Sequence, residues 1–147
     1  MADSRSQRKK RKLYALSRAA EKWKELKACA DEERKQALNQ RALIFHLDDV
    51  GAGWEYVHFS LDGRTVDSFR ISYIGPDVRS FVSAVSSLKE EDCAEVVFCD
   101  EPGEYFLVFA RKMDVLYIEL PGMKKGVFQE YAVFRDRILQ EERKYYG

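Results

Sequence analysis

Asp62 and Gly63 stand between two runs in which apolar and polar residues alternate, 54–61 and 65–74. An Asp-Gly pair in this setting is typical of a two-residue β-hairpin, because both central residues of a type I′ turn need a positive φ. The pair therefore predicts an antiparallel ribbon. It also predicts the register of that ribbon, since the turn type decides which residues face each other.

An uninterrupted ladder from this turn brings large side chains and one histidine onto the same side of the ribbon. The expected cross-strand pairs are Leu61 with Arg64, His58 with Asp67, Tyr56 with Phe69, and Trp54 with Ile71. The His58–Asp67 pair would be an ordinary polar contact between neighbouring strands.

The rest of the chain after residue 38 repeats the order of three strands and one helix. Six short apolar or alternating runs predict strands, at 42–47, 54–61, 65–74, 94–99, 105–110 and 115–120. Turns are expected at Gly75-Pro76-Asp77, Glu101-Pro102-Gly103-Glu104 and Pro121-Gly122, the second a type II turn. Helices are expected at 77–88, with an apolar stripe of Val78, Phe81, Val82, Val85 and Leu88, and at 126–145. The predicted class is α+β, with a mainly antiparallel six-stranded sheet in an α-βββ-α-βββ-α order.

The N-terminal segment has a different character. Residues 8–38 contain no Gly or Pro and repeat small apolar residues at helical spacing, so one long helix is expected. Its apolar stripe is narrow and rich in alanine, with Trp23 as the one large side chain. We therefore expect a basic N-terminal tail and helix over 1–38 and a globular α+β domain over 39–147.

Charge divides the chain in the same way. The 25 basic and 25 acidic residues cancel overall, but residues 1–36 carry 12 Lys and Arg against 6 Asp and Glu, and the remainder carries 13 against 19. Opposite charge in two parts of a chain is typical of a protein with charged partners.

The basic part is concentrated in one run: Arg8, Lys9, Lys10, Arg11 and Lys12. Such a run can bind nucleic-acid phosphates through residues 5–12, act as a nuclear-localisation signal, or be a solvated terminus. The sequence alone leaves these alternatives open. The rest of the chain shows no aromatic RNA-recognition motif.

The acidic part falls mostly in predicted loops. The candidate partner-binding residues are Asp48, Asp49, Glu90, Glu91, Asp92, Glu101 and Glu104. A negative rim suits a basic protein partner, because complementary charge speeds encounter and selects among partners. The alternative is that these acids only aid solubility.

No pattern of residues predicts a reaction, a metal site or a cofactor. His46 and His58 lie on neighbouring predicted strands, but a zinc site needs at least three converging ligands. Three cysteines without a Cys-x-x-Cys pair indicate free thiols in a reducing compartment, and acidic neighbours of Cys93 and Cys99 should raise a thiol pKa. With no apolar stretch long enough to cross a bilayer and no secretory signal, we expect a cytoplasmic, non-enzymatic protein.

Four landmarks after Trp54 give a resemblance to a known group: Asp62-Gly63 after an aromatic strand, Ser72-Tyr73-Ile74-Gly75 before a helix, Glu101-Pro102-Gly103 in a hairpin, and an amphipathic C-terminal helix. In this order the chain resembles small uncharacterised bacterial α+β proteins, some of them immunity-like. The resemblance covers about two-thirds of the chain and implies a non-enzymatic protein that binds another protein. It implies no particular binding residue.

Overall fold

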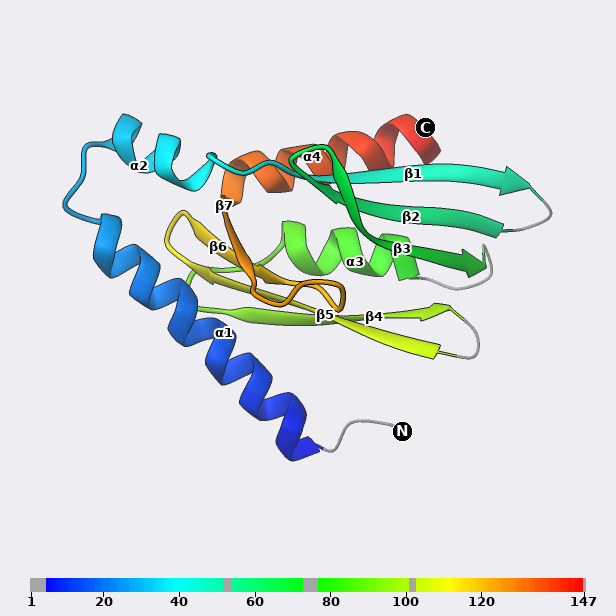
Figure 1. Cartoon of the computed structure of the whole chain (residues 1–147), viewed down its shortest axis with the longest axis horizontal. Coiled ribbons are helices and arrows are strands. Elements are labelled where there is room, and N and C mark those ends of the chain that lie inside the picture. The colour runs from blue at the N-terminus through cyan, green and yellow to red at the C-terminus, as the bar shows by residue number, and fades with distance from the viewer. Residues whose placement is uncertain (1–4, 52–53, 73–76, 101–102, 147) are drawn as a thin grey trace.

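The computed structural model describes residues 5–51, 54–72, 77–100 and 103–146 (Figure 1). Over these residues the order of elements is α1 (Arg5–Leu26), α2 (Asp31–Leu38), β1 (Leu43–Gly51), β2 (Trp54–Leu61), β3 (Arg64–Ser72), α3 (Asp77–Ser86), β4 (Cys93–Asp100), β5 (Gly103–Lys112), β6 (Val115–Glu119), β7 (Val127–Glu130) and α4 (Tyr131–Tyr146). The predicted α+β class is confirmed. The Gly75-Pro76 and Glu101-Pro102 parts of the predicted turns lie outside the described residues.

The strands form two antiparallel sheets, so the prediction of one six-stranded sheet is wrong. Strands β1–β2–β3 make a three-stranded sheet, and β4–β5–β6–β7 make a four-stranded sheet. α3 packs against both sheets (Figure 1), and β3 lies against β4, where the rings of Phe69 and Phe98 are 5.5 Å apart, but the two strands do not pair into one ladder. The second error concerns Val127–Glu130, which we expected at the start of the last helix. Its side chains alternate between the core and α1, so the segment forms the edge strand β7, and the helix begins at Tyr131.

Phe81 of α3 is the centre of the main core. Its ring packs against Phe45 and Phe59 of the three-stranded sheet, with centroids 5.0 and 5.8 Å away. On its other side it packs against Phe98 and Phe109 of the four-stranded sheet, at 5.9 and 5.5 Å. The predicted apolar stripe of this helix is confirmed, since all five of its residues are buried. One helix therefore joins both sheets into a single core.

The Asp62-Gly63 turn is confirmed, because both residues have positive φ, 53° and 83°. Leu61 faces Arg64 as predicted, but the ladder then shifts by one residue. The extra residue is Val66, which forms a β-bulge and makes the other three predicted pairs wrong. The observed pairs beyond the bulge are Phe59 with Asp67, His58 with Ser68, Val57 with Phe69, Tyr56 with Arg70, and Trp54 with Ser72. The shift places Val57 and Phe59 on the same face as Phe69 and Ile71, so all four side chains are buried.

The N-terminal segment is two helices, and the prediction of one helix through 38 is wrong. Leu26 and Leu38 belong to one buried cluster with Val115 of β6. A straight helix would separate these two leucines by about 18 Å along its axis, so the chain must turn between them. The first turn of α2 contains Asp31, Glu32 and Glu33, and their negative charges interact favourably with the positive end of the helix dipole.

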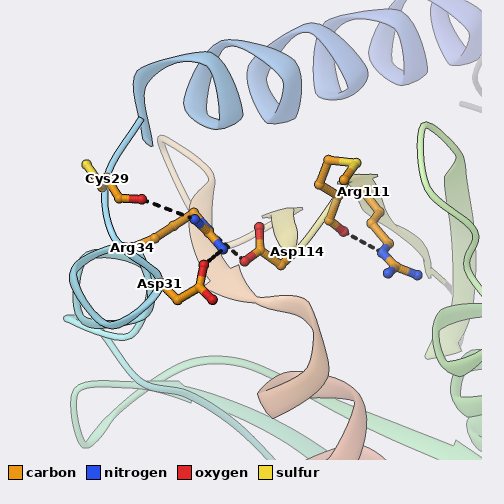
Figure 2. Close-up of polar contacts among 6 residues, drawn as sticks. Cys29, Asp31, Arg34, Arg111 and Asp114 are labelled. Carbon is orange, nitrogen blue, oxygen red and sulfur yellow. Dashed lines mark hydrogen bonds and ion pairs between the residues drawn. The ribbon is translucent and has the colours of Figure 1, made fainter. Parts of the chain in front are cut away.

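An ion pair holds α2 against the β5–β6 turn, as Figure 2 shows. Arg34 donates from Nε to Asp114 Oδ2 and from Nη2 to Asp31 Oδ1, both at 2.8 Å. Its guanidinium also lies 5.3 Å from the ring centre of Trp23. These acidic partners, Asp114 above all, raise the pKa of Arg34. The Arg34 contacts thus join α1, α2 and the four-stranded sheet.

Candidate functional site

The first half of α1 carries a surface of positive charge, which we call the basic surface. It consists of Arg5, Arg8, Lys9 and Lys12, which line an open concavity of about 410 Å³. These positions are three or four residues apart, so they share one side of the helix. Lys10, which belongs to the same basic run, is exposed but does not line the concavity.

A buried carboxylate holds this part of α1 against the four-stranded sheet. Glu95 of β4, whose side chain is 1% exposed, accepts from Arg8 Nε at 2.6 Å and from Arg11 Nη2 at 3.0 Å. Both guanidinium groups also lie over the ring of Phe106, 5.6 and 5.2 Å from its centre. Of the predicted nucleic-acid-binding residues, Arg8 and Arg11 therefore dock the helix. Arg8 remains 45% exposed, so it also belongs to the basic surface.

Small residues explain how closely α1 lies on the sheet. Ala15 and Ala19 are fully buried against Val108, Ala110 and Tyr117. Because alanine side chains occupy little space, they let the helix approach the strands and let Arg8 and Arg11 reach Glu95. The narrow alanine stripe noted in the sequence is the docking face of α1.

A groove of about 280 Å³ begins beside Arg11 and runs between α1 and the segment that follows β6. Phe106 and Val108 contribute to its lining, together with Leu120, Pro121 and Met123. Glu104 and Glu119 also line it. We call this feature the groove.

The predicted acidic partner-binding residues lie at two ends of the fold. Glu90, Glu91 and Asp92 precede β4, whereas Glu104 pairs with Cys99 near the end of that strand. The eight residues of β4 separate these positions by roughly 25 Å. The structure therefore does not gather them into one rim.

Several of these acids already have partners. Glu91 forms an ion pair with Lys112, which lowers the pKa of its carboxyl group. Asp92 accepts from the Cys93 backbone N–H at 2.8 Å. Asp48 and Asp49 lie within β1 and not in a loop, and Glu101 lies outside the described residues.

The two histidines form a hydrogen-bonded network on the outer face of the three-stranded sheet. Asp48 contacts His46 Nε2 through Oδ1 at 2.9 Å and His58 Nε2 through Oδ2 at 3.1 Å. His46 Nδ1 lies 3.0 Å from Glu141 Oε1 of α4, and His58 Nδ1 lies 2.8 Å from Ser68 Oγ. This network is not predicted from the sequence, because it depends on the direct pairing of His46 with His58 across β1 and β2.

The predicted His58–Asp67 pair is wrong because the bulge at Val66 places Ser68 opposite His58. Asp67 instead accepts from the backbone N–H of Gly122 at 2.7 Å, and burial raises the pKa of its carboxyl group. Among the described residues no group of three or more His, Cys, Asp or Glu side chains could hold a metal ion.

Two further features bear on reactivity. Burial is the main cause that raises the pKa of the Cys93 thiol to about 11, and its acidic neighbours Asp92 and Glu95 add to it.

Ser68, His58 and Asp48 form a chain of contacts in the order that activates a serine nucleophile. Such a nucleophile also needs a substrate site, and both the basic surface and the groove lie elsewhere, on α1 and the four-stranded sheet.

A buried carboxylate also lies near the end of α4. Glu55, 2% exposed, accepts from the Tyr146 hydroxyl through both carboxylate oxygens, at 2.8 and 3.1 Å. Burial first, and the bond to Glu55 second, raise the pKa of Tyr146. The Arg79 guanidinium lies 4.7 Å from the centre of the Tyr146 ring. This contact anchors the C-terminal end of α4 on β2.

Comparison with family models, with curated proteins and with solved structures finds no match to this chain. The resemblance to immunity-like proteins therefore stays a prediction. Over the described residues, no helix combines the length and the apolar character needed to cross a membrane.

Proposed function

We propose that this chain is a non-enzymatic nucleic-acid-binding protein that contacts phosphates through the basic surface of α1. One observation carries the proposal: among the described residues, the lining of one concavity consists of four cationic side chains. Phosphate contacts by Lys and Arg supply most of the affinity of sequence-independent nucleic-acid binding.

The docking of α1 supports this proposal. A basic tail that is disordered must lose conformational entropy when it binds, whereas a helix already held in place loses less. Glu95 fixes Arg8 and Arg11, and Ala15 and Ala19 seat the next turns. Since two arginines share the single Glu95 carboxylate, an excess of positive charge remains at this end of α1.

The hypothesis of an acidic rim that binds a basic protein has weaker support in its original form. Its residues lie at both ends of β4, and Glu91 is neutralised by Lys112. Of the predicted acidic residues, Glu104 stands apart because it lines the groove. A protein-binding role is therefore a second candidate at that position only.

Fluorescence anisotropy with a mixed-sequence DNA duplex of about 20 base pairs tests the proposal. Between 50 and 200 mM salt the logarithm of the association constant should fall with a slope of about −3 to −4 against the logarithm of salt concentration, as expected for about four phosphate contacts. The double variant Lys9→Gln/Lys12→Gln should reduce the size of that slope by about 2.

The matched control is Lys24→Gln/Lys27→Gln, which removes the same charge about 20 Å further along the N-terminal segment. Both control lysines are exposed. The control should bind the duplex nearly as well as the unchanged protein. Absence of binding at about 50 mM salt, or an equal effect of both double variants, contradicts the proposal.

A further inference from the structure

The groove has an acidic and aromatic floor on the outer face of the four-stranded sheet. Glu104, Phe106 and Val108 are two residues apart along β5, so their side chains point to the same face. Val108 pairs with Glu119 of β6, which therefore belongs to that face as well.

The same face shows how the fold accommodates a guanidinium group. Val108 pairs with Glu95 on its other side, so Glu95, Val108 and Glu119 form one row across three strands. At the Glu95 end of this row, Arg11 bonds to the carboxylate while its guanidinium lies over Phe106. Both ends of the row thus present a carboxylate, that of Glu95 and that of Glu119.

At the Glu119 end, the described residues place no such cation against the carboxylate. The Glu119 carboxylate accepts a long hydrogen bond of 3.4 Å from the Tyr117 hydroxyl. Within the described part of the chain, neither Glu119 nor Glu104 forms a salt bridge. The described lining of the groove carries two carboxylates, those of Glu104 and Glu119, and one guanidinium, that of Arg11, so one negative charge is left over.

We propose that the groove binds an arginine side chain presented by a partner protein, with the guanidinium against Glu119. The apolar walls formed by Leu120, Pro121 and Met123 would contact the methylene groups of that arginine. Arginine fits better than lysine because a planar guanidinium bonds a carboxylate in a bidentate manner.

Glu104 plays a different part from Glu119. Glu104 lies four residues before Val108, a distance of about 13 Å along the strand. Because Val108 pairs with Glu119, Glu104 is too far from Glu119 to form an ion pair with the same guanidinium group. Its charge attracts the basic segment to the outer end of the groove. This inference is independent of the proposed nucleic-acid binding, because it concerns a surface of opposite charge.

The test uses N-acetyl-arginine amide as the probe and nuclear magnetic resonance of the full chain as the readout. The neutral isostere N-acetyl-citrulline amide is the matched control ligand. We expect saturable amide shift changes at 104–108 and 119–123 with the arginine probe and none with the citrulline probe. Glu119→Gln should weaken binding by about tenfold and Glu104→Gln by about threefold.

Glu90→Gln serves as the control variant, since Glu90 is exposed at the other end of β4 and should bind the probe like the unchanged protein. Equal shifts with the citrulline probe overturn the inference, as does binding that survives Glu119→Gln in a folded variant. An absence of saturable shifts overturns it too. The Lys9→Gln/Lys12→Gln variant should retain arginine binding, so this result is separable from the nucleic-acid assay.

Discussion

Arg11 donates to Glu95 at 3.0 Å across the interface of α1 and β4, and the acceptor side chain is 1% exposed. This pair, with Arg8, joins residues more than 80 positions apart in the chain. It determines that the basic part of α1 lies on the sheet.

Glu95→Gln should release the N-terminal turns of α1. Removing one partner of a buried ion pair leaves the other charges uncompensated, and because both arginines are partly exposed we expect a loss of about 1–2 kcal/mol in the free energy of unfolding. Hydrogen exchange should increase at 9–14 more than at 15–26. Glu21→Gln, which removes an exposed partner of Arg18, should change neither quantity. Unchanged exchange at 9–14 in the Glu95 variant would show that the ion pair does not hold the helix.

Phe81→Ala should destabilise the whole protein, because its ring contacts both sheets. A cavity at a fully buried phenylalanine costs about 3–5 kcal/mol, and Phe81→Leu should cost about 1.5 kcal/mol. Urea denaturation gives both values. Leu13→Ala, at a side chain that is 56% exposed on α1, should leave the midpoint nearly unchanged. Separate transitions for the two sheets in the Phe81→Ala variant would contradict a single shared core.

Cys93 should react slowly with iodoacetamide at pH 8. Its thiol pKa is raised from 9.0 to about 11, so the thiolate fraction at this pH is about a hundredfold below that of an ordinary thiol. The rate should rise tenfold per pH unit up to about pH 11. The shift leaves the free energy of unfolding unchanged below about pH 9, and the protein loses stability as the pH rises from 9 through 11, because the unfolded thiol ionises before the folded one.

Peptide mass spectrometry can follow Cys93 and the exposed Cys99 in one sample. In the folded protein Cys99 should be alkylated first, and in urea the two rates should become similar. Equal rates in the folded protein would contradict the burial of Cys93.

Tyr146→Phe should cost about 1–3 kcal/mol in the free energy of unfolding, because it leaves the buried Glu55 carboxylate without the hydroxyl donor. Tyr14→Phe is the control, since Tyr14 is 53% exposed. The double variant Glu55→Gln/Tyr146→Phe should lose less than the sum of the single variants. Spectrophotometric titration should show that Tyr146 ionises above the usual range of tyrosine, because its pKa is raised. Additive losses would show that the two groups do not interact.

Local features of this fold are readable from the sequence, and long-range ones are not. The Asp62-Gly63 turn depends on two residues, and the stripe around Phe81 depends on helical spacing alone. The bulge at Val66 carries no local signal, because it arises from the need to bury residues of both strands. The separation into two sheets likewise depends on contacts between segments far apart in the chain, such as that of Phe69 with Phe98.

The candidate site likewise has a part that the sequence predicts and a part that only the folded chain shows. Its charge is visible in the sequence as a run of basic residues, but the run does not show which side chains face the protein. That distinction depends on Glu95, about 85 residues away, which orients Arg8 and Arg11 and leaves Lys9 and Lys12 on the concavity. The groove joins β5 with the segment after β6, so it exists only in the folded chain.

The packing of α3 against both sheets has a consequence for synthesis on the ribosome. The strands that cover one side of Phe81 precede it in the chain, whereas Phe98 and Phe109, which cover the other side, are made later. A nascent chain that ends near Ser86 therefore exposes half of its future core. Completion of the native core must wait for β4 and β5, and until they emerge the apolar stripe of α3 lacks half of its packing.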